Sequence, residues 1–346
     1  MQFKVSVLGH FGEGKILLNG QTVKTKIITE ELAHRLGDNQ IMKIDTHGGW
    51  KSLLKAPFQV IKALSKSENV LIFPARNGLR VYAPLLTAFR SLFKSTELHY
   101  SVIGGWLPQF VEGKKILIAA LKRFNGIYVE TETMKAVLDK MGFANVYVMP
   151  NCKKLTVLSE DTLVYPSEPP YRLCTFSRVM KEKGIEDAVN AVKQINSELG
   201  YTAYTLDIYG QVDEGQTEWF ENLKKAFPDY ISYGGLVPFE KSVEVLKDYF
   251  ALLFPTFYKG EGFAGTLIDA YSAGVPVIAS DWKYNAELVN DNTGYVFPTG
   301  DLNALVGILR NAVENPDSII SKKILCLKEV EKYRIEKAIN VFTFLK

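Results

Sequence analysis

Two carboxylates surround a glycine-rich segment in the second half of the chain. The sequence GEGFAGTLIDAYSAGVPVIAS spans residues 260–280, and within it Glu261 and Asp269 stand on either side of the glycines. A helix is predicted to begin near Thr266, soon after an apolar strand at 251–254. Backbone N–H groups at such a helix start attract anions, and glycines let a ligand approach the backbone. Carboxylates also occur at helix starts for electrostatic reasons alone, but a purely structural start does not need three glycines.

A pair of cations follows an earlier strand. The segment CTFSRVMKEKGIEDAV, residues 174–189, places Arg178 and Lys183 in a turn before a helix that opens at Gly184. Two cations at this spacing can converge on one diphosphate and stabilise the charge that builds on a leaving phosphate. The alternative is a solvated basic loop, the commoner fate of Lys and Arg. The carboxylates could bind the hydroxyl groups of a sugar or a ribose, and the cations could bind phosphates. A nucleotide diphosphate sugar contains all of these groups.

Short, almost continuously apolar segments recur along the chain, as expected of strands buried on both faces of a sheet. They lie at 3–8, 41–44, 70–73, 98–103, 126–129, 146–149, 172–176, 205–209, 231–233, 251–254, 275–279 and 294–297. Segments of helical period alternate with them, at 21–36, 51–67, 79–94, 112–123, 131–141, 184–199, 217–227, 239–249, 266–273, 301–314 and 318–345. This alternation predicts an α/β protein with doubly wound parallel sheets.

The alternation stops at 150–170, where four prolines and no apolar period indicate a linker. We therefore expect two α/β domains. Such sheets bind ligands beyond the carboxyl ends of their strands, so a cleft between the domains is expected. Two glycine turns end strands of the second domain: IYGQ, which contains Gly210, and YGGLVP, residues 233–238.

Charge is distributed unevenly. Residues 1–160 contain 22 Lys and Arg against 12 Asp and Glu, and residues 161–346 contain 19 against 26, so the two halves carry +10 and −7. A basic half is drawn to anionic partners, although scattered charge that serves only solubility is the alternative.

Composition excludes several classes of protein. Disordered, collagen-like and disulfide-scaffold proteins do not have this balance of residues. Three distant cysteines without a CxxC pair favour a reducing compartment. We predict no signal peptide and no apolar run of the roughly 18 residues that cross a bilayer.

Residues 172–300 resemble the C-terminal domain of the retaining glycosyltransferases of the GT-B fold, family 4. The resemblance rests on four motifs in a fixed order: SRVMKEKG, IYGQ, YGGLVP and EGFAGTLIDAYSAGVPVIAS. The resemblance implies two Rossmann-like domains facing a central cleft. Residues 1–160 would form the acceptor domain, joined by a helix at about 325–346 that crosses back. Residues 165–324 would bind the nucleotide sugar.

The resemblance also assigns roles to residues. Arg178 and Lys183 would contact the donor diphosphate, and Glu261 would hold sugar hydroxyls; these three are the catalytic candidates. Asp269, where the family usually has Glu, would hold the ribose. The other donor-binding candidates lie in glycine turns, backbone segments and the helix start: Gly210, Leu236, Val237, Gly262, Phe263, Ala264, Gly265 and Thr266.

The N-terminal domain, through GHFGEGKILLNGQTVKTK, HYSVIGGWLP and VMPNC, resembles bacterial transferases that build capsular polysaccharides and exopolysaccharides. Candidates on its side of the cleft are Gly14, Asn19, Gly20, Gln21, His10, Arg76 and Asn77. Many relatives carry a catalytic-site His where this chain reads IGGW, residues 103–106. His10 and His47, each after a predicted strand, could face the cleft instead, although a lone His is more often structural.

The activity implied is transfer of a sugar from a nucleotide diphosphate sugar, with UDP-sugar as the first choice, to a saccharide acceptor. The acceptor would be carried on a lipid, the anomeric configuration would be retained, and the pathway would be surface polysaccharide biosynthesis. No DxD-like pair stands at a strand end, so we expect no metal and no other cofactor.

A lipid-linked acceptor implies a cytoplasmic protein at the inner face of the cell membrane. The basic segment 50–66 could lie on anionic lipid, or it could simply pack on its own sheet. No nucleic-acid partner is expected. The competing interpretations are another GT-B activity, such as a sugar-nucleotide hydrolase or epimerase, and a non-catalytic two-domain sugar-binding protein.

Overall fold

The computed structural model describes residues 2–12, 20–48, 53–93 and 95–346. The chain forms two compact units: unit 1 contains Met1–Lys154 and Tyr333–Lys346, and unit 2 contains Leu155–Lys332. The chain therefore passes between the units twice, at 154–155 and 332–333. The sequence had placed these changes at 160–165 and at about 325.

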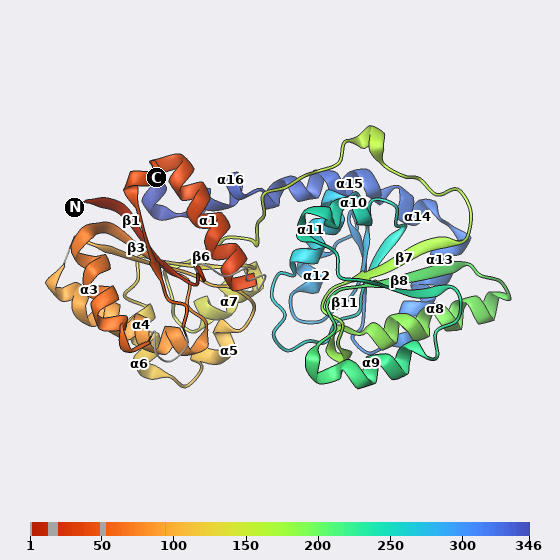
Figure 1. Ribbon diagram of the computed structural model, residues 1–346, viewed down its shortest axis with the longest axis horizontal. Helices are drawn as coiled ribbons and strands as arrows, with labels where there is room; N and C mark the ends of the chain where they lie inside the picture. Colours follow the sequence, from red (N-terminus) through yellow and green to blue (C-terminus); the bar gives the residue numbers. More distant parts are fainter. Residues whose placement is uncertain (1, 13–19, 49–52, 94) are drawn as a thin grey trace. The chain divides into compact units, whose positions relative to one another are not determined.

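Unit 1 is built on a six-stranded parallel sheet in the order β2-β1-β3-β4-β5-β6 (Figure 1). The strands are β1 (Phe3–Gly9), β2 (Ile41–Asp45), β3 (Ser67–Ile72), β4 (Glu97–Ser101), β5 (Gly126–Val129) and β6 (Val146–Val148). The helices are α1 (Gly20–Leu36), α3 (Ala56–Lys66), α4 (Arg76–Phe89), α5 (Leu107–Val111), α6 (Lys115–Leu121), α7 (Glu132–Lys140) and α16 (Ile335–Ala338).

The core of unit 1 includes residues from both ends of the chain. Val5 and Val7 of β1 are fully buried, because helices cover both faces of the sheet. α16 packs against α1, and Ile335 and Phe342 are fully buried in the same cluster as the strands. The hydroxyl of Tyr128 in β5 accepts a hydrogen bond from the Thr343 backbone N–H at 3.1 Å. Residues 333–346 are therefore part of this core.

Unit 2 repeats the architecture with the strand order β12-β11-β10-β7-β8-β9 (Figure 1). Its strands are β7 (Tyr171–Phe176), β8 (Tyr204–Tyr209), β9 (Ile231–Gly235), β10 (Ala251–Phe254), β11 (Val277–Ser280) and β12 (Gly294–Phe297). Its helices are α8 (Ile185–Leu199), α9 (Thr217–Lys224), α10 (Ser242–Leu246), α11 (Gly265–Ser272), α12 (Asn285–Leu288), α13 (Leu302–Glu314), α14 (Asp317–Ile320) and α15 (Lys322–Val330). The prediction of two doubly wound α/β domains is confirmed.

Three local predictions were wrong. The helix expected at 112–123 begins later than its predicted first residue, because Gly113 adopts a left-handed φ of +72°. α6 therefore begins only at Lys115, and the residues before the glycine form α5, which the sequence did not predict. The single helix expected at 318–345 is broken, because the backbone is extended at Arg334, which forms a parallel bridge with Lys153.

Each sheet has a point at which the strand order reverses. In unit 2 the chain runs from β7 to β8 and β9 on one side and then continues from β10 on the other. In unit 1 the reversal lies between β1 and β3. Loops at the carboxyl ends of the two strands diverge there, and open α/β sheets bind their ligands at such points.

Candidate active site

The turn that follows β7 is fixed against the loop that follows β10. A 3-10 turn at Lys181–Lys183 leads into α8 through Gly184, whose φ is +71°. A Cβ atom at Gly184 would lie 2.1 Å from the Pro255 carbonyl oxygen, so no larger residue fits. The Phe257 N–H donates to the Glu182 carbonyl oxygen at 2.8 Å. These contacts hold the two loops together at the reversal point of the sheet.

Lys183 and Glu261 form an ion pair across this junction. The distance from Lys183 Nζ to Glu261 Oε2 is 2.6 Å, and the two side chains are only 12% and 7% exposed. The buried hydroxyl of Thr256 donates to the same carboxylate oxygen at 2.9 Å. The Lys183 ammonium also lies 5.2 Å from the centre of the Tyr258 ring. The result is a charged, partly desolvated pair in which electrostatic interactions are stronger than in water.

Arg178 lies earlier in the same connection between β7 and α8 and has a different partner. Its Nη1 atom is 3.6 Å from Asp213 Oδ2, and its side chain is 60% exposed. The loop is held by backbone bonds between Val179 and residues 211 and 213. Gly210 is required at its base, because a Cβ there would lie 1.8 Å from the Ser177 carbonyl oxygen. Arg178 and Lys183 were expected to converge on one diphosphate; in this structure each is paired with its own carboxylate.

The start of α11 has the properties of an anion-binding helix terminus. Ala264 occupies the N-cap position without a side-chain cap, so the first N–H groups are not satisfied by a capping side chain. Thr266 Oγ1 is buried and has no hydrogen-bond partner among the described residues. Asp269, one turn further, is 8% exposed. Gly262, Phe263 and Gly265 lie in the same loop and first turn.

The glycine turn after β9 adjoins the Arg178 loop. The Gly210 N–H donates to the Gly235 carbonyl oxygen at 2.9 Å. Gly235 adopts a φ of +77°, and Leu236 after it is 65% exposed. Val237 is partly buried. All the donor-binding candidates of unit 2 therefore follow the carboxyl ends of β7, β8, β9 and β10.

In unit 1, the histidines after β1 and β2 contact each other. His10 Nε2 and His47 Nδ1 are 2.6 Å apart, and His10 Nδ1 is 2.8 Å from Thr22 Oγ1. Asp45 Oδ1 accepts from the backbone N–H groups of Phe11 and His47. Burial, reinforced by His47 and opposed by Asp45, lowers the pKa of His10. This environment therefore favours the neutral imidazole of His10.

The other candidates of unit 1 have separate environments. Gln21 Nε2 donates to the Phe73 carbonyl oxygen after β3 at 2.9 Å, while Gly20 is exposed at the start of α1. Arg76 and Asn77 form the exposed first turn of α4. The Arg76 guanidinium lies 5.8 Å from the centre of the Trp106 ring. Gly14 and Asn19 lie outside the described residues.

Sequence reasoning missed the residues that position these groups. Thr256 follows β10 and bonds Glu261, and Asp213 pairs with Arg178. Nothing in the spacing of Thr256 or Asp213 distinguishes them from ordinary loop residues. Their role depends on which loops the sheet brings together.

Two general properties of the described residues bear on the site. Within the described ranges, no group of three or more His, Cys, Asp or Glu side chains is arranged to hold a metal ion. Across the same residues, no helix combines the length and the apolar composition needed to cross a bilayer.

Unit 2 matches a known family. Residues 170–315 match the sequence model of the family described as Glycosyl transferases group 1. This range contains the Lys183–Glu261 pair, the Arg178 loop and the start of α11.

Two curated proteins are similar over part of their length. The UDP-N-acetylglucosamine–peptide N-acetylglucosaminyltransferase GtfA subunit of Streptococcus gordonii is 30% identical over 198 residues, which are 56% of this chain and 38% of that protein. The amylovoran biosynthesis glycosyltransferase AmsK of Erwinia amylovora is 25% identical over 172 residues, which are 47% of this chain and 40% of that protein. The similarity thus spans less than half the length of either relative.

A solved structure is similar over the whole chain. The Anabaena protein Alr3699/HepE, crystallised in complex with UDP, has a TM-score of 0.72 over 98% of each chain at 12% identity. This identity shows a shared fold. Two doubly wound units with this neighbour have the GT-B fold of glycosyltransferases, and residues 170–315 of the second unit match the glycosyl transferases group 1 model.

Proposed function

We propose that this protein is a glycosyltransferase that moves a sugar from a nucleotide diphosphate sugar to a saccharide acceptor with retention of anomeric configuration. A UDP-sugar is the first choice of donor. The observation that carries the proposal is the Lys183–Glu261 pair, 2.6 Å apart at the reversal point of the sheet in the matched domain. UDP-sugar is the first choice because the relative GtfA is named for UDP-N-acetylglucosamine and HepE was crystallised with UDP.

The chemistry assigns a separate task to each charge. A lysine ammonium has three N–H donors, so Lys183 can keep its bond to Glu261 while it donates to a diphosphate oxygen. Both bonds to the Glu261 carboxylate use Oε2, so a sugar hydroxyl would be met by Oε1. Arg178, exposed on its loop, would swing to the phosphates. The two cations would stabilise the leaving diphosphate without a metal.

The remaining donor contacts follow from the same edge of the sheet. The N–H groups at the start of α11 and the Thr266 hydroxyl would bind phosphate oxygens. Asp269 would hold the ribose, and the backbone at Leu236 and Val237 would face the base. Gly262, Phe263, Ala264 and Gly265 would allow the sugar and phosphates to approach the main chain.

Unit 1 would supply the acceptor side. The candidates are Gly14, Asn19, Gly20, Gln21, His10, Arg76 and Asn77. No protein base is required in this proposal, because a donor phosphate oxygen can accept the proton of the acceptor hydroxyl. The bond from the donor sugar to the diphosphate breaks, and the sugar forms a new bond to the acceptor oxygen on the same face.

A lipid-linked acceptor fits the surface of α3. Leu54, Phe58 and Ile61 recur along one side of this region and are 68%, 78% and 39% exposed. Lys55 and Lys62 beside them are exposed as well. Apolar side chains flanked by lysines are suited to the interface of an anionic membrane. The proposal therefore includes a cytoplasmic protein at the inner face of the membrane in surface polysaccharide synthesis.

Calorimetric titration with UDP, GDP, ADP and dTDP, without metal, tests the donor site. We expect one diphosphate to bind, and Arg178→Ala to weaken its binding about tenfold, the loss of one charge-assisted contact. The matched control is Arg310→Ala, which removes an arginine of α13 that pairs with Glu198 of α8. If no diphosphate binds at about millimolar concentration, or if both variants behave alike, the donor-site assignment is wrong.

Transfer is then measured with the matching sugar nucleotides. Free sugar released at the same rate with and without acceptors would favour a hydrolase instead. The acceptor panel includes peptides as well as lipid-linked saccharides, because the relative GtfA is named for transfer to peptide. NMR of the product distinguishes retention from inversion.

Cosedimentation with phosphatidylglycerol vesicles tests the membrane surface. Phe58→Ser should weaken binding, whereas Ile116→Ser, at an equally exposed residue of α6, should not. Equal effects of both substitutions would contradict a membrane face at α3.

A further inference from the structure

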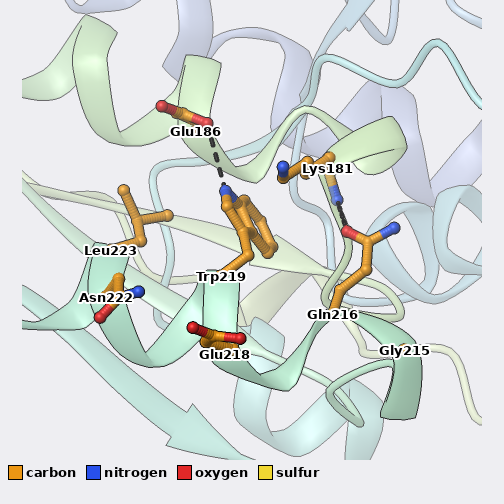
Figure 2. A pocket seen from close by; sticks show the side chains of 8 residues that line it. All are labelled: Lys181, Glu186, Gly215, Gln216, Glu218, Trp219, Asn222 and Leu223. Atoms are coloured by element: carbon orange, nitrogen blue, oxygen red, sulfur yellow. Dashed lines mark hydrogen bonds between the residues drawn. The ribbon is translucent and has the colours of Figure 1, made fainter.

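Unit 2 contains a hollow outside the proposed donor site. A cavity of about 660 Å³ lies between the start of α8 and the helix α9 (Figure 2). Its lining includes Lys181, Glu186, Gln216, Glu218, Trp219 and Asn222. None of the donor-binding candidates lines it. Its volume lies in the range of small-molecule sites, about 300–1,000 Å³.

The indole of Trp219 lies in the middle of the lining residues (Figure 2). The side chain is partly buried and packs against the hydrophobic core. Its Nε1–H donates to Glu186 Oε2 at 3.3 Å, and Lys181 Nζ lies 5.8 Å from the ring centre. The core contact and the hydrogen bond fix the orientation of the indole. A fixed aromatic surface costs little conformational entropy when a ligand stacks on it.

The polar groups around the indole suit hydroxyl groups better than phosphates. Glu186 and Glu218 bring two negative charges, and Lys181 brings one positive charge. A net negative lining repels an anion. Carboxylate oxygens accept from hydroxyls, and the amides of Gln216 and Asn222 both donate and accept. An aromatic face among such groups matches a pyranose ring, which has an apolar C–H face and a rim of hydroxyls.

We propose that this cavity binds a neutral oligosaccharide, with one sugar ring stacked on Trp219 and its hydroxyls bound by Glu218 and the amides. The entering ring replaces the Lys181 ammonium over the indole, and that ammonium then donates to a hydroxyl. This site is independent of the donor chemistry, since none of its residues takes part in it.

The cavity shares one structural element with the donor site. Gln216 Oε1 accepts from the Lys181 N–H at 2.7 Å, and Gln216 Nε2 donates to Glu182 Oε2 at 2.8 Å. The next residue, Lys183, is the one paired with Glu261. A saccharide bound in the cavity therefore lies against the turn that carries Lys183.

Saturation-transfer NMR of the full chain, first without and then with saturating UDP, tests the proposal. The probes are linear neutral trisaccharides of glucose, mannose, galactose and N-acetylglucosamine, with trigalacturonate as an anionic comparison. At least one neutral probe should bind with a Kd of about millimolar order, and trigalacturonate should bind more weakly. Trp219→Ala should abolish binding. Because that variant can disturb packing, Glu218→Gln is the second variant.

Glu218→Gln should weaken binding about tenfold, the loss of one hydrogen bond to a charged group. The matched control is Glu221→Gln on the same helix, where the exposed carboxylate pairs with Lys224 outside the cavity; it should leave binding unchanged. The proposal is overturned if none of the neutral probes binds at about 20 mM. Displacement of the probe by UDP, or equal effects of the two glutamine variants, would overturn it as well.

Discussion

Lys323 is expected to destabilise the folded protein, and its replacement by Met should stabilise unit 2. The side chain is fully buried, and its Nζ donates to the Tyr249 carbonyl oxygen at 3.1 Å. Burial lowers the pKa of Lys323 from 10.5 to about 8, although nearby Cys326, Asp248 and Cys174 oppose this shift. The folded state therefore holds the ammonium less well than water does.

The pKa gives the size of the effect. At roughly 1.4 kcal/mol per pH unit, keeping Lys323 charged costs about 3 kcal/mol at pH 7. Lys323→Met removes this cost but leaves the Tyr249 carbonyl without its partner, a loss of about 1 kcal/mol. We therefore expect Lys323→Met to raise the free energy of unfolding by about 2 kcal/mol at pH 7.

The direction of the pH dependence follows from the same values. Between pH 8 and 10.5 the unfolded chain binds more protons at Lys323 than the folded chain. The contribution of Lys323 to stability therefore becomes more favourable as the pH rises across this window. Below pH 8 the cost applies in full. The advantage of Lys323→Met should therefore be constant below pH 8 and decline towards pH 10.5. Burial raises the pKa of Cys174 and of Cys326, so these thiols ionise in the unfolded chain within the same window and lower the stability of the folded protein as the pH rises. Both the parent and Lys323→Met contain these cysteines, so this contribution cancels in the difference between them.

Urea unfolding followed by tryptophan fluorescence measures the effect. With Trp50 and Trp106 replaced by Phe, the signal comes from Trp219 and Trp282, both in unit 2. Lys332→Met is the control, because Lys332 is 67% exposed and should change stability little. A loss of stability for Lys323→Met at pH 7, or a difference that does not shrink by pH 10, would refute the reasoning.

Two further predictions concern a tight turn of unit 2 and a buried ion pair of unit 1. Gly200→Ala places a Cβ in open space at a φ of +76°, so it should lower the free energy of unfolding by about 1 kcal/mol. Gly184→Ala brings a Cβ to 2.1 Å from the Pro255 carbonyl oxygen, so it should lower the free energy of unfolding by at least about 2 kcal/mol more. Gly184→Ala should also weaken nucleotide binding in calorimetry. Equal losses of stability in the two variants would show that the loop around Gly184 can rearrange to accept a Cβ. Lys24→Met leaves Glu130, 2.7 Å away and 3% exposed, without its counter-charge, so unit 1 should lose about 3–5 kcal/mol in urea unfolding. Adding Glu130→Gln should restore most of that loss, and a single variant within about 1 kcal/mol of the parent would contradict a buried ion pair.

The sheets could be predicted from sequence because their strands are apolar on both faces. The segments at 70–73 and 251–254 are short and nearly uninterrupted, a pattern that helices with one polar face do not show. Helix ends were less accurate, since a single left-handed residue such as Gly113 decides whether a helix continues. The spacing of apolar residues does not encode that choice.

The charged residues of the candidate site could be predicted from the sequence, but the residues that bond to them could not. Lys183 and Glu261 stand out by type and by their neighbouring glycines, and the fold brings them within 2.6 Å. Thr256 and Asp213 became visible only when the loops after different strands were placed side by side. Trp219 falls in a segment, 217–227, for which the sequence predicted only a helix, because the cavity around it depends on how α8 and α9 pack.

The double passage of the chain between the units has a consequence for biosynthesis. The core of unit 1 contains Ile335, Ile339 and Phe342, which a ribosome adds only after the whole of Leu155–Lys332. Unit 2 is continuous and can fold as soon as it emerges. Most of unit 1 is translated first, but its core stays incomplete, with apolar surface exposed, until unit 2 and residues 333–346 have been translated. Folding during synthesis would proceed from the second unit back to the first, and a released chain that ends near residue 332 would contain a complete unit 2 beside an incomplete unit 1.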